Sequence, residues 1–149
     1  MLIALSLAIG GFLQASASVE ITNLRCEYLT EPLGIDADSI AGLIPLSGQA
    51  VTHFSWRRKQ GIPDLQPTID RTAPLYHVRP DAPPYVIICG DRELELFGRY
   101  EENAYLWRML RLTGHPDATI YELDGYNHGD MAHPAFHILK ASIARLLPH

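Results

Sequence analysis

Polar side chains able to do acid–base chemistry follow three apolar segments of this 149-residue chain. They are Ser47, then Asp91 and Glu93, and finally His128. A carboxylate beside a histidine can hold the imidazole as a neutral base, ready to accept a proton from an attacking hydroxyl group. The residue types therefore indicate nucleophilic acyl transfer, provided that the fold brings them together.

The three apolar segments have the composition of β-strands. Residues 40–47 form a short apolar run, which Pro45 interrupts. Residues 84–90 are β-branched and continuously apolar, as in a parallel strand buried on both faces, and residues 118–123 form a third run. Helical patterns alternate with these strands. The order predicts an α/β fold with a mostly parallel sheet flanked by helices.

Two helices are predicted after the second and third strands. The first covers residues 100–112 and is followed by Gly114, a C-terminal cap that would take a left-handed conformation. The second begins near Pro134 and ends before Pro148. The expected buried residues are Ala104, Trp107 and Leu110 (flanked by Leu106 and Met109) in the first helix, and Phe136, Leu139, Ile143 and Leu146 in the second.

Parallel strands bring their carboxyl ends to one edge of the sheet, where ligands bind in open α/β folds. An acidic group after one strand and His128 after the next would therefore lie side by side. From position alone, either Asp91 or Glu93 could be that acid.

The order of strand, Gly-Asp-x-Glu, long helix, strand and Leu-x-Gly-x-x-His resembles the C-terminal half of an α/β-hydrolase of the esterase/lipase type, similar to carboxylesterases and arylformamidases. The likeness covers about residues 28–147. It implies that His128 is the triad histidine and Glu93 the triad acid, with Asp91 as the alternative. It also implies that residues 48–83 form a cap-like insertion near an acyl pocket.

The chain departs from this family at the nucleophile. The family's serine lies in Gly-x-Ser-x-Gly at a strand-to-helix turn, and this motif is absent from the sequence. The resemblance implies a single partial domain over residues 1–149, with the nucleophile and N-terminal strands missing and little activity alone. Ser47 is the only serine worth testing as a substitute, although a turn serine explains it more simply.

Residues 48–83 are too apolar for a solvated linker. Loops of this length often bind ligands. A surface excursion with one packed helix explains the segment equally well. Gln49, Phe54 and Trp56 are the candidate substrate-binding residues, with packing as the alternative for the two aromatic side chains.

Composition narrows the possible partners. The net charge is −5 and the densest cationic run is only Arg57–Lys59, so no nucleic-acid surface is expected. Residues 2–13 are apolar but too short to span a membrane. They are predicted to form a buried helix, which suits a cytoplasmic protein. Alternatively, residues 1–17 are a signal peptide of a secreted one, although no positive charge precedes them.

The leading hypothesis is therefore a serine-hydrolase-type enzyme for a small carboxylic ester or related amide, without a cofactor or metal. A second hypothesis is a truncated binding domain without activity. A third is a metal-dependent hydrolase that uses His128, Asp130, His133 and His137. A partial sheet would also expose a strand edge, so self-association is expected.

Overall fold

Residues 40–147 are described in the computed structural model. They belong to the compact unit formed by Ile35–His149. The apolar segment at residues 1–17, predicted as a buried helix or a signal peptide, lies outside the described residues. No helix within residues 40–147 is long and apolar enough to cross a membrane.

The centre of the fold is a parallel pair of strands, β1 (Tyr85–Gly90) and β2 (Ala118–Leu123). Tyr85 pairs with Ala118 and Gly90 with Leu123, so the two strands end level with each other. Five of the six residues of β1 are buried, which agrees with its continuous apolar sequence. The sequence prediction of both strands is confirmed, and the α/β character with it.

The predicted strand at residues 40–47 is present only as two parallel bridges to β1, Leu43 to Tyr85 and Leu46 to Ile88. Backbone hydrogen bonds join Leu43 and Ser47 to the other edge of β1. Pro45 accepts a hydrogen bond from Ile88 but has no N–H to return one. This gap in the ladder explains why the segment pairs with β1 without forming a regular strand.

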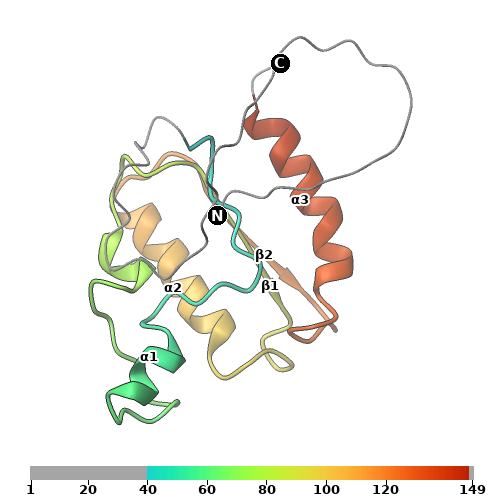
Figure 1. The fold of residues 1–149 in the computed structure, drawn as a ribbon. Coiled ribbons are helices and arrows are strands. Elements are labelled where there is room, and N and C mark those ends of the chain that lie inside the picture. The colour runs from blue at the N-terminus through green and yellow to red at the C-terminus, as the bar shows by residue number, and fades with distance from the viewer. Residues whose placement is uncertain (1–39, 148–149) are drawn as a thin grey trace, which may run out of the picture. The chain divides into compact units, whose positions relative to one another are not determined.

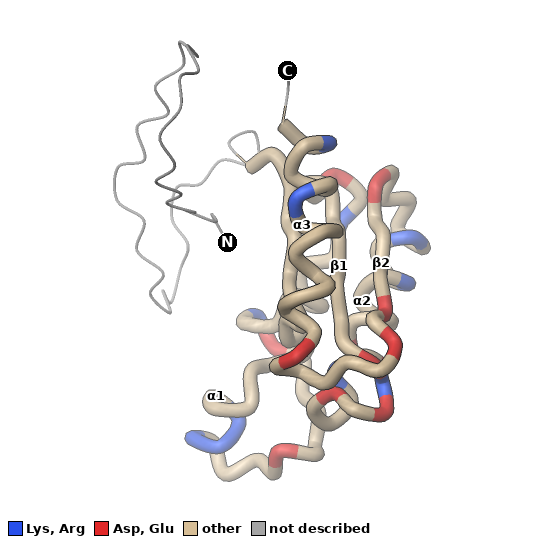
Figure 2. Tube along the Cα trace, turned by 90° about the vertical axis from the view of Figure 1, so that its right-hand side faces the viewer, with Lys and Arg blue, Asp and Glu red and all other residues tan. Residues whose placement is uncertain are grey.

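Two long helices cover the two faces of the sheet (Figures 1 and 2). Helix α2 (Arg99–Leu112) packs on one face through Leu106 and Leu110, which contact Ile87 and Cys89. Helix α3 (Ala132–Leu146) covers the other face, where Met131 and Ala135 contact Val86 and Ile88. Alternate side chains of β1 therefore enter two separate apolar clusters, as the pleat of a strand requires.

The faces that these helices bury differ from the predicted ones. In α2 the buried residues are Arg99, Asn103, Leu106 and Leu110, whereas Ala104 and Trp107 are only partly buried. In α3 they are Ala135, Leu139 and Ser142, and Phe136 is 42% exposed. The prediction that Phe136 is buried was wrong, because the small Ala135 and Ser142 lie on the buried face in phase with Leu139. The left-handed Gly114 after α2 is confirmed, with φ 88°.

The segment at residues 48–83 contains the short helix α1 (Phe54–Lys59) and the 3₁₀ helix η2 (Pro74–His77). Arg57 from the basic run of α1, drawn blue in Figure 2, is only 4% exposed. Its guanidinium donates hydrogen bonds to the carbonyl oxygens of Thr52, Pro63, Asp64 and Gln66. This one side chain ties α1 to the turn that follows it.

Candidate functional site

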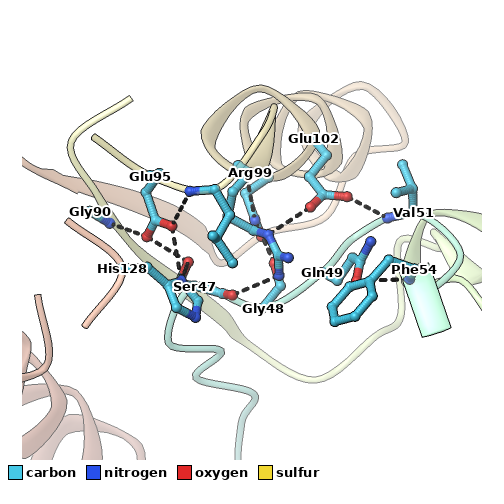
Figure 3. Close-up of polar contacts among 12 residues, drawn as sticks. Ser47, Gly48, Gln49, Val51, Phe54, Gly90, Glu95, Arg99, Glu102 and His128 are labelled. Carbon is cyan, nitrogen blue, oxygen red and sulfur yellow. Dashed lines mark hydrogen bonds and ion pairs between the residues drawn. The ribbon is translucent and has the colours of Figure 1, made fainter. Parts of the chain in front are cut away.

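Three side chains meet where the parallel segments end, as the sequence predicts for that edge of the sheet. Ser47 follows the segment bridged to β1, Glu95 lies in the turn after β1, and His128 lies in the loop after β2. Nδ1 of His128 is 2.9 Å from Oε2 of Glu95 and 3.0 Å from Oγ of Ser47. Figure 3 shows the three side chains directed toward one another.

The Glu95 carboxylate accepts hydrogen bonds from several groups around it. Ser47 Oγ donates to Oε1 over 2.6 Å, the backbone N–H of Gly90 donates to the same oxygen over 3.0 Å, and the N–H of Leu96 reaches Oε2 over 3.1 Å. The side chain of Glu95 has no exposed surface. Burial by itself raises the pKa of this carboxyl, but hydrogen bonds from Ser47, Gly90, Leu96 and His128 outweigh it and leave the pKa below its ordinary value.

The hydrogen bonds determine which nitrogen of His128 carries the proton. A carboxylate can only accept hydrogen bonds, so the 2.9 Å contact with Glu95 requires a hydrogen on Nδ1. The other ring nitrogen, Nε2, has no hydrogen-bond partner among residues 40–147. The His128 side chain is 45% exposed. Neutral His128 therefore offers the lone pair of Nε2 as a base from a partly open position.

Gly90 allows the backbone to approach this site closely. A Cβ atom at this position would lie 2.5 Å from the carbonyl oxygen of Tyr126 and 3.0 Å from Oε1 of Glu95. The Tyr126 carbonyl accepts a hydrogen bond from the N–H of Asp91. The glycine that ends β1 therefore lets the His128 loop pass against the Glu95 turn.

The acids named from the sequence take other positions. Glu93 is exposed, and its side chain makes no hydrogen bond or ion pair with any residue in the described range. The Asp91 carboxylate accepts hydrogen bonds from the N–H groups of Glu93 and Gly125. These bonds, led by the one from Gly125, lower the pKa of Asp91. Asp91 thus joins two loops, and the structure brings Glu95, rather than Glu93 or Asp91, against His128.

The candidate substrate-binding residues make local contacts. Gln49 accepts a hydrogen bond from the N–H of Phe54 over 3.4 Å. The Phe54 ring lies 4.3 Å from the ring of His53 and beneath the guanidinium of Arg58. Trp56 is 44% exposed on α1. Gln49 and Phe54 are separated from His128 by Arg99 in the view of Figure 3.

Polar side chains of α2 make hydrogen bonds to the backbone of Ser47 and of the residues after it; Arg99 and Glu102 are labelled in Figure 3. Arg99 Nη1 donates to the carbonyl oxygen of Ser47, and Asn103 Nδ2 donates to that of Gly48. Glu102 accepts from the N–H of Val51 and pairs with Arg99 at 2.9 Å. Burial raises the pKa of Glu102, against the opposing effects of Val51 and Arg99.

Sequence reasoning did not identify Arg99, Glu102 or Asn103. Arg99 and Asn103 share a helical phase with Leu106 and Leu110, since the four positions are spaced at four, three and four residues. Polar residues in phase with buried leucines indicate buried hydrogen bonds. This signal was available in the sequence.

Cys89 lies near this edge, one residue before the Gly90 that ends β1. The Cys89 thiol is buried, and burial raises its pKa to about 12, so it is not a nucleophile near neutral pH. The metal-binding hypothesis involved His128, Asp130, His133 and His137. No cluster of three or more potential metal ligands occurs within residues 40–147.

A cavity of about 510 Å³ is lined in part by Leu43, Tyr85 and Leu110. Tyr85 begins β1, so the cavity lies toward the opposite end of the strands from His128.

Comparison of the chain with models of known protein families, with curated proteins and with solved structures found no match.

Proposed function

We propose that His128 and Glu95 form the acid–base part of a hydrolytic site that cleaves a small carboxylic ester or a related amide. The observation that carries this proposal is the bond between buried Glu95 and Nδ1 of a half-exposed His128, which leaves Nε2 open. The resemblance to α/β-hydrolases of the esterase/lipase type supports the same reaction class.

In the proposed reaction, Nε2 of His128 accepts the proton of a hydroxyl group as its oxygen adds to the substrate carbonyl. The bond from carbon to the leaving oxygen or nitrogen then breaks, and the imidazolium returns the proton to the leaving group. Glu95 stabilises the positive imidazolium through Nδ1–H and keeps the ring oriented. A water molecule then attacks the acyl group left on the attacking oxygen, by the same proton transfers, and the carboxylic acid product is released.

The attacking serine hydroxyl and the donors for the oxyanion come, in this proposal, from groups outside residues 40–147. Within the described range, Ser47 is the serine next to His128, and it lies at Nδ1 rather than at the open Nε2. The catalytic base and its acid can still activate water toward a reactive ester, at a much lower rate.

The test is hydrolysis of p-nitrophenyl acetate by the 149-residue chain. We expect slow release of nitrophenolate above the buffer rate, and we expect His128→Ala to remove that excess. Because water takes the place of the serine, the expected loss is about 10²-fold, the low end for a positioned base.

His133→Ala is the matched control, since His133 is an exposed histidine of α3. This variant should retain the wild-type rate, and so should the wild-type chain in the presence of a chelator. Equal rates for wild type and His128→Ala would contradict the proposal. Loss of the rate with chelator would favour a metal-dependent reaction instead.

A further inference from the structure

Ser47 makes hydrogen bonds to both members of the acid–base pair. Its Oγ is 2.6 Å from Oε1 of Glu95 and 3.0 Å from Nδ1 of His128. A hydroxyl has a single proton, and a carboxylate accepts only, so the proton of Ser47 goes to Glu95. Ser47 Oγ therefore accepts from the Nδ1–H of His128, which is shared between Ser47 and Glu95. The Ser47 proton is therefore bonded to Glu95, whereas a nucleophilic serine would have to give its proton to the base.

We infer that Ser47 is a positioning residue, whose hydroxyl fixes the Glu95 carboxylate and holds the proton of His128 on Nδ1. The inference rests on the proposed function of His128 and Glu95. It assigns Ser47 a role in the site that is distinct from nucleophilic attack, and also distinct from that of a turn serine that satisfies only its own backbone.

The backbone of Ser47 supports this role. Its φ is 45°, and it is the only residue other than glycine with a positive φ in the described range. A left-handed conformation is strained for a residue with a Cβ atom. Glycine would adopt it more easily, so the backbone alone does not explain the presence of serine. Strained residues of this kind occur at functional sites.

Hydrogen bonds on both sides hold Ser47 in this conformation. Its N–H donates to the carbonyl oxygen of Ile88 over 2.7 Å, and its own carbonyl oxygen accepts from Arg99 over 3.0 Å. The next carbonyl, that of Gly48, accepts from Asn103 over 2.6 Å. Ser47 is 4% exposed. The neighbouring elements thus fix the direction of Oγ between Glu95 and His128.

The charge state of Glu95 agrees with this geometry. Burial raises the pKa of Glu95, and the hydrogen bond from Ser47 is the foremost of the effects that lower it. Removing the hydroxyl should therefore raise the pKa of Glu95. This shift can be measured without any enzymatic turnover.

The experiment compares Ser47→Gly with Ser47→Thr in the full chain. Glycine removes the hydrogen bond to buried Glu95, which lowers stability, but it also relieves the backbone strain, so the melting temperature should stay close to that of wild type. Threonine keeps a hydroxyl but is β-branched at positive φ, so the melting temperature should fall. If Ser47 had a purely structural role, the Glu95 titration and the His128 tautomer would change most in the less stable variant, Ser47→Thr. A positioning role predicts that they change in Ser47→Gly instead.

The site is observed by NMR. In Ser47→Gly we expect the carboxyl carbon of Glu95 to titrate at higher pH than in wild type, and part of the neutral His128 population to move its proton to Nε2. In Ser47→Thr both signals should remain close to wild type. Unchanged signals in a folded Ser47→Gly chain would overturn the inference, as would covalent labelling of Ser47 by a fluorophosphonate.

The two failures can be told apart. If the wild-type chain gives no His128-dependent hydrolysis of p-nitrophenyl acetate, the proposed function fails. The titration of Glu95 and the tautomer of His128 still report whether Ser47 positions them. If hydrolysis is present and Ser47→Gly leaves both signals unchanged, only the role of Ser47 fails.

Discussion

Glu95→Gln is expected to reduce the His128-dependent hydrolysis of p-nitrophenyl acetate by about 10²-fold, to the level of the buffer. Glutamine keeps the size of the side chain but removes the charge that stabilises the imidazolium. Its amide group can also present N–H to Nδ1, which favours the proton on the wrong ring nitrogen. Rates of nitrophenolate release at neutral pH measure the effect.

Glu93→Gln is the matched control, two residues away on the same turn. The Glu93 side chain is exposed and makes no hydrogen bond or ion pair with any residue in the described range, so this variant should keep the wild-type rate. Loss of the rate in Glu93→Gln, with retention in Glu95→Gln, would contradict the assignment of Glu95. It would instead assign the role of the acid to Glu93, as the family resemblance implies.

Arg57→Ala is expected to give the largest loss of stability, about 3 kcal/mol in the free energy of unfolding. Arg57 is 4% exposed and donates to four backbone carbonyl oxygens. Alanine would leave these carbonyls without their donor and open a cavity beneath α1. Urea unfolding followed by circular dichroism measures the change.

Arg58→Ala is the control for this prediction. Arg58 is the next residue in the same helix, and its side chain is 60% exposed where it pairs with Asp64. Exposed ion pairs contribute about 0–1 kcal/mol, so this variant should unfold close to wild type. Equal losses for Arg57→Ala and Arg58→Ala would show that the buried hydrogen bonds of Arg57 contribute little.

The strands and long helices could be predicted because their signals are local. The apolar run of β1 and the glycine after α2 each indicate their structure within a few residues. The helix faces were less predictable. Phe136 is the largest apolar side chain of α3, yet the face that packs on β1 contains the small Ala135. Close approach of a helix to a sheet favours small residues, and the pattern of large apolar residues does not reveal it.

The approach of His128 to the turn after β1 could also be predicted, but the carboxylate that contacts it could not. The rule that parallel strands end at one edge placed His128 beside the turn after β1. Within that turn, Asp91 and Glu93 occupy its first residues, and Glu95 is directed inward. The direction depends on the hydrogen bonds from Gly90 and Ser47, and Ser47 is 48 residues away. No spacing rule within the turn contains this information.

The contacts of two other buried polar residues, Arg57 and Ser47, could not be predicted from the sequence. Arg57 lies in a run of three basic residues that resembles a solvated surface. It is buried because carbonyl oxygens of the turn that follows α1 converge on it, which depends on the path of residues 60–66. Ser47 was noticed through its position after an apolar run, but its contacts depend on the fold.

The pairing of His128 with Glu95 can be tested by nitrogen-15 NMR of the His128 ring in the wild-type chain, at a pH where the imidazole is neutral. We expect the proton to reside on Nδ1 and Nε2 to be bare. We also expect this preference to weaken in Glu95→Gln and to persist in Glu93→Gln. A neutral ring with its proton on Nε2, unaffected by either substitution, would contradict the pairing of His128 with Glu95 on which the proposed function depends.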